Sequence, residues 1–326
     1  MSPTALLLTH SGDHYTIDRV IEAIERRGGE AIRLDTDTFP HALDLEAMLD
    51  ADAIEPAVVL ADRRVDPAAV RGVWCRRLWS APPPEGMPED MALACTRESA
   101  AALRFWLAGL EGRARFVNPF DRETAAENKA RQLAAARAVG LNIPPTLVTN
   151  RPDAARAFWH AHQGRVVAKM LTPYAMGMDR TESVYTSPVT AADLDHLDGL
   201  RQSPMVFQAR IDKAHELRAI VVGDRVFAGA IDATQSTTGQ TDWRRALPGE
   251  LEWRPGHVPP ELAARLCAVV RALGLVYGAA DVIVQPDGTP VFLEVNPAGE
   301  WGMIEKHLDH PIADAIAAEL LAEPTP

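Results

Sequence analysis

Two carboxylates and one amide interrupt apolar strands in the last fifty residues of the chain. Asp281 lies in the predicted strand Tyr277–Val284, and Glu294 and Asn296 lie in and just after the predicted strand Pro290–Val295. Glu294 and Asn296 are two residues apart, so their side chains leave the same sheet face. A carboxylate among apolar neighbours is unfavourable unless something pairs with it. Mg²⁺, which takes carboxylate and amide oxygens and shares its shell with phosphate, would do so. The pattern alone also fits a solvated sheet face.

Two lysines upstream have the chemistry to hold phosphate. Lys169 ends the predicted strand Val166–Lys169, just before a polar segment, and Lys129 lies inside the helix predicted over Glu123–Val139. An ammonium group that projects from a strand end toward a loop is a suitable point-charge contact for phosphate. Taken singly, each lysine is more typical of an exposed surface position.

A third feature is the predicted strand Met205–Ile211, which leads to Glu216 and Arg218. Its main-chain N–H and C=O groups could pair with an adenine ring, and a nearby acid could bind ribose hydroxyls. By itself, the same pattern also fits an ordinary strand followed by a charged turn.

The elements that position these residues follow from the apolar periodicity. A strand at Thr4–His10, a helix at Thr16–Arg27 and a strand at Ala31–Leu34 give a β-α-β start, which is typical of a parallel sheet. Further predicted elements are strands at Ala57–Leu60 and Gly72–Leu78, helices at Met91–Leu110, Pro152–His162, Ala191–Leu200 and Ile312–Leu321, and a hairpin of Leu217–Val222 and Arg225–Ile231 turning at Gly223-Asp224.

We expect three units: an N-terminal α/β domain over residues 1–117, a central subdomain over 118–202 and a C-terminal subdomain over 203–326 that carries the metal site. The polar segments 172–188 and 232–249 are predicted to be mobile loops. Such loops could cover a reactive intermediate.

Composition excludes several classes of function. The formal net charge of −12 argues against binding to nucleic acid or to an anionic membrane surface. No apolar run is long enough to span a bilayer, and the N-terminal residues do not form a signal peptide. The cysteines Cys75, Cys95 and Cys267 are widely spaced, which indicates reduced structural thiols in a cytoplasmic protein.

In their order along the chain, these features resemble the ATP-grasp superfamily: helix lysine, strand lysine, loop, hinge strand, acid and a final D…E-x-N trio. The segment Glu294–Pro297 is the most specific part of the resemblance. Further segments are similar to the microviridin-type graspetide synthetases, which form ω-ester and ω-amide rings in peptides. These segments are Leu7–Val20, Arg33–Pro40, Asp242–Arg244 and Pro297–Trp301.

The resemblance implies an ATP-grasp fold with an N-terminal pre-ATP-grasp α/β domain, and ATP and Mg²⁺ as cofactors. Asp281, Glu294 and Asn296 would hold Mg²⁺. The implied nucleotide contacts are Lys129 and Lys169 on the phosphates, Gln208, Ala209 and Ile211 at the adenine, and Glu216 on the ribose. Arg218 and Arg244 would neutralise the transferring phosphoryl group or the acyl phosphate.

The implied activity is ADP-forming macrocyclisation of a ribosomal precursor peptide. An Asp or Glu side chain of the peptide would be phosphorylated, and a Ser/Thr hydroxyl or a Lys amine would then close an ester or amide ring. The resemblance also implies a leader helix on the precursor that docks on the enzyme. The oligomeric state stays open, a homodimer included.

Two rival functions use the same residues. A carboxylate–amine ligase of the glutathione synthetase or ribosomal-protein glutamate ligase type would use the same ATP site on a different substrate. A nucleotide- or peptide-binding module would perform no chemistry. The cluster of His10, Ser11 and His14 admits a catalytic role, a role in shaping the acceptor side of the site, or a structural one. Trp243 and Trp301 could wall the peptide site or pack in the core.

Overall fold

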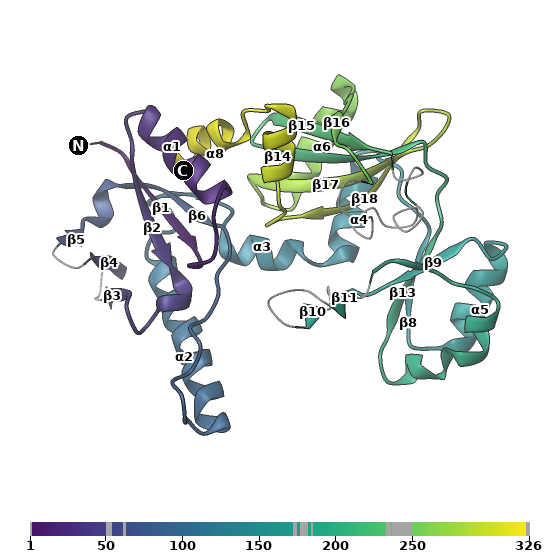
Figure 1. Cartoon of the computed structure of the whole chain (residues 1–326), viewed down its shortest axis with the longest axis horizontal. Helices are drawn as coiled ribbons and strands as arrows, with labels where there is room; N and C mark the ends of the chain where they lie inside the picture. Colours follow the sequence, from purple (N-terminus) through teal and green to yellow (C-terminus); the bar gives the residue numbers. More distant parts are fainter. Residues whose placement is uncertain are drawn as a thin grey trace.

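A computed structural model of the chain shows helices packed on five β-sheets within the part of the chain that it describes (Figure 1). The described residues are 2–49, 54–60, 63–171, 175–176, 182–183, 185–232, 236 and 250–323. Among these residues, no helix combines the length and the apolar character that a membrane crossing requires. The mixed α/β class predicted from the sequence is confirmed.

The N-terminal sheet is parallel, with the strand order β2-β1-β6-β7. Its strands are β1 (Thr4–Thr9), β2 (Glu30–Asp35), β6 (Val70–Cys75) and β7 (Arg115–Val117). Every residue of β1 is buried because helices cover both faces of the sheet. Alternate residues of β1 therefore belong to two cores, one shared with α1 (Thr16–Arg26) and the other with α2 (Glu89–Ala108). The predicted β-α-β start is confirmed.

A small antiparallel sheet follows β2 in the chain. It consists of β3 (Asp44–Leu49), β4 (Ile54–Leu60) and β5 (Arg63–Val65), with the 3-10 segments η1 (Thr36–Thr38) before it and η2 (Pro67–Ala69) after it. The strand predicted at Ala57–Leu60 lies within β4. Neither β3 nor β5 is predicted, because their mixed polar sequences contain no extended apolar run.

The prediction of a single helix over Glu123–Val139 is wrong, because the structure contains two helices there. These are α3 (Phe120–Ala126) and α4 (Lys129–Ala138). Asn128 has an extended conformation and its side chain accepts a hydrogen bond from the Arg131 N–H at 3.2 Å, which is an N-cap. Lys129 is consequently the first residue of α4 rather than an interior helix residue.

The central sheet is antiparallel, with the strand order β12-β9-β13-β8. Its elements are β8 (Thr146–Thr149), α5 (Pro152–Ala161), β9 (Val166–Lys169), β12 (Ser187–Pro188), η3 (Ala192–Arg201) and β13 (Met205–Ala209). The helix predicted at Ala191–Leu200 is instead the 3-10 segment η3, with non-helical torsion angles at His196.

The segment 172–188, predicted to be a loop, contains short strands. β10 (Ala175–Met176) pairs with β11 (Glu182–Ser183), and β12 pairs with β9. Residues 172–174, 177–181 and 184 lie outside the described part of the chain, as do most residues of the second predicted loop, 232–249.

The C-terminal sheet is antiparallel, with the strand order β16-β15-β14-β17-β18. Its strands are β14 (His215–Val222), β15 (Arg225–Ile231), β16 (Arg254–Pro255), β17 (Tyr277–Val284) and β18 (Pro290–Asn296). The accompanying helices are α6 (Pro260–Ala272), α7 (Gly302–Leu308) and α8 (Ile312–Leu321). The predicted hairpin at Gly223-Asp224 is confirmed, whereas α7 is not predicted.

The two faces of this sheet differ in character. Leu217, Ala219 and Val221 of β14 share a core with α6, as expected for alternate residues of one strand. On the opposite face, Ile220 and Val222 share a core with α8. Toward the start of β14 the same face becomes polar, at Glu216 and Arg218. The sheet therefore has one apolar face and one face that changes from apolar to charged along its length.

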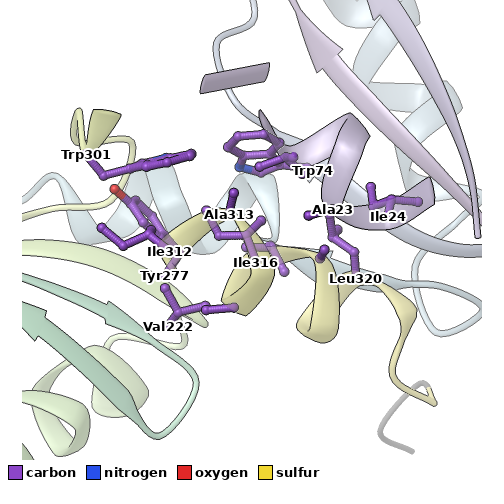
Figure 2. Close-up of a cluster of buried hydrophobic side chains, with 14 of the residues drawn as sticks. Ala23, Ile24, Trp74, Val222, Tyr277, Trp301, Ile312, Ala313, Ile316 and Leu320 are labelled. Carbon is purple, nitrogen blue, oxygen red and sulfur yellow. The ribbon is translucent and has the colours of Figure 1, made fainter. Parts of the chain in front are cut away.

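Helix α8 joins the N-terminal domain to the C-terminal sheet, and it lies between them in Figure 1. Figure 2 shows the buried side chains of this junction: Ile312, Ala313, Ile316 and Leu320 of α8, Ala23 and Ile24 of α1, Trp74 of β6, Val222 and Tyr277 of the sheet, and Trp301. Trp301 is 1% exposed, so of its two predicted roles the structure supports core packing. The other residue of that prediction, Trp243, lies outside the described residues.

Gly72 of β6 sets the distance between the N-terminal sheet and α8. A Cβ atom at this position would lie 2.2 Å from the main-chain oxygen of Leu320. Because the obstacle is backbone, α8 would have to move away. We predict that Gly72→Ala lowers the free energy of unfolding by about 2–3 kcal/mol, in the range for overpacking.

Gly199 is the matched control, because a Cβ atom there meets nothing within 4 Å and the residue has no left-handed φ angle. Chemical denaturation followed by tryptophan fluorescence should show a lower midpoint for Gly72→Ala and little change for Gly199→Ala. Equal midpoints for the two variants would mean that β6 and α8 do not approach as closely as described.

Asn118, directly after β7, connects the N-terminal domain to the C-terminal sheet. Its side-chain NH₂ donates to the main-chain oxygens of Tyr277 at 2.9 Å and Pro297 at 3.0 Å. Its side-chain oxygen accepts from the N–H groups of Val276 and Tyr277, both at 2.8 Å. The residue is 2% exposed, so these bonds are shielded from water. One side chain thus fixes both the start of β17 and the residue that follows β18.

We predict that Asn118→Ala lowers the free energy of unfolding by about 3 kcal/mol or more, because it leaves several buried main-chain groups without partners. The control is Asn142→Ala, since that exposed side chain makes a single hydrogen bond of 3.4 Å to Pro290. Thermal unfolding of both variants would test this, and a similar melting temperature for the two would contradict it.

Candidate active site

Three charged residues form a row across the charged part of the C-terminal sheet. Arg218 of β14 lies opposite Asp281 of β17, which in turn lies opposite Glu294 of β18. Directly opposed residues on neighbouring strands share a face, so all three side chains leave the sheet on one side. Asn296 lies two residues beyond Glu294 and opposite Ala279. The structure therefore confirms that Glu294 and Asn296 leave the same face, and it places Asp281 on that face as well.

Arg218 is the cation at the start of this row. One of its terminal nitrogens lies 3.0 Å from each carboxylate oxygen of Asp281, and the other donates to the main-chain oxygen of Glu300 at 3.2 Å. Burial acts to lower the pKa of Arg218, but Asp281, Tyr277 and Glu294 outweigh it and the pKa is raised. The guanidinium group therefore stays charged, as a buried pair requires.

Lys129 supplies the cation at the other end of the row, where its amine binds the Glu294 carboxylate. The first turn of α4 carries this lysine to edge strand β18. Gln132, one turn farther along α4, fastens the helix to the strand: its NH₂ group donates to the Val295 oxygen at 2.8 Å, and its oxygen accepts from the Val295 N–H at 3.1 Å. Lys129 is thus placed against Glu294 by a buried hydrogen-bond pair next to it.

The donor set of this row suits a hard divalent cation. It offers the carboxylates of Asp281 and Glu294 and the exposed amide of Asn296, whose oxygen also accepts from the Ala298 N–H at 3.0 Å. No group of three or more His, Cys, Asp or Glu side chains placed to hold a metal occurs among the described residues. Two carboxylates and an amide match Mg²⁺, which usually completes its shell with water and phosphate oxygens.

Two arginines that were not predicted as site residues reach this region from the N-terminal domain. Arg76 and Arg77 follow β6, and both bind the carboxylate of Glu300, Arg77 at 3.2 Å. Arg76 also donates to the Ala298 oxygen at 3.1 Å. The other carboxylate oxygen of Glu300 accepts from the Gly302 N–H at 2.8 Å at the start of α7.

Charge pairing has a clear effect on Glu300. Burial acts to raise its pKa, but Arg76, the Gly302 N–H and Arg77 outweigh burial, so the pKa is lowered.

The sequence contains one signal that could have identified Arg76 and Arg77 as site residues. They stand at the carboxyl end of a parallel strand, where ligand-binding residues of α/β sheets gather.

The other predicted nucleotide residues are spread over the central sheet, the C-terminal sheet and the segment between them. Lys169 ends β9 and lies opposite Val206 of β13, on the central sheet. Gln208 of the same sheet is 4% exposed, and its side chain donates to the Thr146 hydroxyl at 2.9 Å. The Ala209 N–H donates to the Pro145 oxygen at 2.9 Å. Neither the Gln208 side chain nor the Ala209 N–H is therefore available for adenine without rearrangement.

Glu216 lies two residues before Arg218 on β14, on the same face of the C-terminal sheet, and Lys213 binds its carboxylate at 2.7 Å. Ile211 lies between the two sheets in sequence, beyond the end of β13. Arg244 lies outside the described residues. The structure thus brings together Lys129, Arg218, Asp281, Glu294 and Asn296. Lys169, Gln208 and Ala209 lie on the other, central sheet.

Comparison with known proteins agrees with this architecture. Residues 4–124 match the family model described as the MvdD pre-ATP grasp domain. The macrocyclase MdnC from Microcystis aeruginosa, solved with the precursor peptide MdnA, is 35% identical, with 98% of this chain and 99% of that chain covered and a TM-score of 0.85. The macrocyclase MdnB from the same species is 41% identical, with 98% and 99% covered and a TM-score of 0.81.

A third solved structure is the RiPP-associated ATP-grasp ligase of Chryseobacterium gregarium, in complex with ADP and a leader and core peptide. It is 30% identical, with 98% of this chain and 96% of that chain covered and a TM-score of 0.88. Ligases of this fold have also been solved with AMPPNP and with Mg and ADP. A search among curated proteins finds no significant match.

The match of the N-terminal domain and the whole-chain likeness to peptide macrocyclases agree with the charged row on the C-terminal sheet. This chain therefore belongs to the graspetide-type ATP-grasp ligases, with a pre-ATP-grasp domain followed by the ATP-grasp fold.

Proposed function

We propose that this protein uses ATP to close rings in a ribosomally made precursor peptide. The observation that carries the proposal is the continuous set of contacts from Lys129 through Glu294 and Asp281 to Arg218, on a chain at least 30% identical over nearly its whole length to three peptide ligases. The peptide complexes of two of these ligases support a peptide substrate, and one of the complexes contains a leader peptide. In the proposal, the leader of this protein's substrate is a helix.

The proposed chemistry has two steps. An oxygen of an Asp or Glu side chain of the peptide attacks the γ-phosphorus of ATP, and ADP leaves. A Ser/Thr hydroxyl or a Lys amine then attacks the activated carbonyl carbon, and phosphate leaves as the ester or amide bond forms. Phosphoryl transfer of this kind depends mainly on positioning and charge neutralisation, which the protein can supply with fixed side chains.

Each residue has a proposed role. Asp281, Glu294 and Asn296 would hold Mg²⁺, which when bound neutralises charge on the phosphate oxygens. The groups assigned to the nucleotide are Lys129 and Lys169 at the phosphates, the Gln208–Ile211 main chain at the adenine, and Glu216 at the ribose. Arg218 and Arg244 would neutralise the transferring phosphoryl group.

Charge balance supports the phosphate roles. Within the described row, Lys129 neutralises Glu294 and Arg218 neutralises Asp281. The magnesium complex of ATP remains anionic, so binding it beside a neutral row calls for additional positive charge. Lys169 on the central sheet and Arg244 are the cations proposed to supply it.

Intact mass measurement tests the proposed reaction. The enzyme is mixed with ATP, Mg²⁺ and candidate precursor peptides, which are short peptides rich in Ser/Thr and Asp/Glu sought among the open reading frames beside its gene. Because each ring eliminates one water, we predict a loss of about 18 Da per ring, with one ADP released for each. A mass gain would indicate ligation to a second substrate, and an unchanged mass without ADP would indicate a binding module. Either result would contradict the proposal.

Glu294→Gln tests the metal role. The substitution removes a charged oxygen donor and the partner of Lys129, so we predict a fall in the ring-closure rate of about 100-fold or more, partly relieved by raising the Mg²⁺ concentration. Calorimetric titration should also show weaker Mg²⁺-dependent ADP binding. Glu261→Gln is the control, because Glu261 is exposed and binds only Arg265 on the outside of α6. Normal metal dependence in Glu294→Gln would exclude this carboxylate as a ligand.

A further inference from the structure

His10 is a buried imidazole with unused hydrogen-bonding capacity. It follows β1, is 6% exposed, and its ring stacks on Trp79 at 3.7 Å between centroids and 4° between planes. Among the described residues, five buried side-chain polar atoms have no hydrogen-bond partner, and two of them are the ring nitrogens of His10. Since buried polar groups are normally paired, this ring calls for an explanation.

The polar groups around His10 are paired with one another. The Thr9 hydroxyl donates to Asp13 at 2.6 Å, and both the N–H and the hydroxyl of Ser11 donate to Asp37, at 2.9 and 2.6 Å. Arg33 donates to the main-chain oxygen of His10 at 3.0 Å. This loop is therefore a hydrogen-bonded frame that fixes the imidazole without using either ring nitrogen.

The position of His10 in the fold favours a ligand role. In the order β2-β1-β6-β7, β1 connects to β2 on one side and has β6 on its other side, so the strand order reverses between β1 and β6. Open parallel sheets bind ligands outside the carboxyl ends of the strands at such a point. His10 stands at the carboxyl end of β1, and Arg76 and Arg77 stand at the carboxyl end of β6.

Contacts connect this point to the charged row. Arg77 acts electrostatically on His10 and binds the carboxylate of Glu300 at 3.2 Å. Arg218 donates to the main-chain oxygen of the same Glu300 at 3.2 Å, and it holds Asp281. Arg77, Glu300 and Arg218 therefore relate the imidazole to the residues assigned to phosphoryl transfer, with His10 on the N-terminal domain side of Glu300.

We propose that His10 binds the Ser or Thr hydroxyl of the peptide substrate and takes up its proton as that oxygen attacks the activated carboxyl carbon, an inference that rests on the proposed function. The hydroxyl oxygen forms the ester bond to the carbonyl carbon. The bond from this carbon to the phosphate oxygen breaks, and phosphate leaves with the electron pair. The hydroxyl proton ends on a ring nitrogen of His10.

The charges around the ring favour a neutral hydroxyl over an ammonium group. Burial is the largest influence on His10 and lowers its pKa; Asp13 and Asp37 act to raise the pKa, and Arg77 and Arg33 act to lower it. The net effect is a pKa below the ordinary value, so the ring is neutral near pH 7 and keeps a lone pair. The two acids are engaged by Thr9 and Ser11, which leaves them less able to attract a lysine side chain.

Trp79 would control access to the ring. It covers one face of His10, and it lies in the stretch from Arg76 to Pro84, which has no helix or strand. The main-chain N–H of Trp79 donates to the Thr36 hydroxyl at 3.0 Å, and that hydroxyl donates to the main-chain oxygen of Thr9 at 3.0 Å. A substrate hydroxyl can reach a ring nitrogen once this irregular segment shifts, while the backbone anchor keeps the segment near the site.

The test separates activation of the carboxyl from ring closure. The full chain reacts with ATP, Mg²⁺ and a candidate precursor peptide in the presence of hydroxylamine, which converts an acyl phosphate to a hydroxamate and adds about 15 Da. For His10→Asn we expect ring closure to slow by about 100-fold, the usual contribution of a general base, while hydroxamate still forms. The ratio of hydroxamate to ring should therefore rise.

Two further variants make the result specific. His10→Phe keeps an aromatic ring to stack on Trp79 but has no nitrogen, so it should behave as His10→Asn does. His14→Gln alters an exposed histidine four residues away and should keep the wild-type ratio. The wild-type ring-closure rate should also rise with pH through a pKa below about 6.5, and this limb should be missing in His10→Asn.

Two outcomes would overturn the role of His10. Ring closure at the wild-type rate in His10→Asn would exclude it as the base, and an equal loss of hydroxamate and ring in both His10 variants would indicate a structural role only. If the wild-type enzyme forms neither hydroxamate nor ring, the proposed function itself fails, and the inference fails with it.

Discussion

The structure depends on pairing two acids with cations on a sheet face that is partly apolar. An isolated carboxylate in such a position would be protonated or would destabilise the fold, because burial penalises its charged form. Arg218 and Lys129 remove that penalty by pairing with Asp281 and Glu294. The pairs leave a row of nearly neutral overall charge whose oxygens and nitrogens all face one side. Any ligand that separates these ion pairs must therefore offer each charged side chain an equally strong replacement. A metal–phosphate complex does so, because the metal ion can bind the carboxylates and the phosphate can bind the cations.

Several buried polar side chains exist to hold this row in place. Gln132 fixes the helix that carries Lys129, and Asn118 fixes the strand that carries Asp281 together with the turn after Asn296. These contacts satisfy main-chain groups that would otherwise be unpaired, so they stabilise the fold and orient the site with the same bonds. Helix α8 adds a large apolar contact between the N-terminal domain and the sheet (Figure 2). Rigid support of this kind is what positioning chemistry needs.

Local patterns in the sequence predict much of this arrangement. Short apolar runs identify β14, β17 and β18, and the two-residue spacing places Glu294 and Asn296 on one face. The end of a helix is harder to predict. Asn128 stops one helix and caps the next within a run of good helix formers, and the capping bond to Arg131 is visible only in the structure. Strands such as β3 are missed because their sequences mix polar and apolar residues and contain no extended apolar run.

Long-range pairing is the part of the site that no local pattern reveals. Glu300 follows the segment Glu294–Pro297, yet its partners Arg76 and Arg77 come directly after a strand more than two hundred residues earlier. Their meeting depends on how α8 and Asn118 seat the N-terminal domain against the C-terminal sheet. The arginines therefore link the two halves electrostatically, at the place where the strand ends of the N-terminal domain meet the charged row of the C-terminal sheet. The proposed phosphoryl transfer from a nucleotide to a peptide would need such a place, because each half of the protein could then hold one reactant while their reacting atoms meet between them.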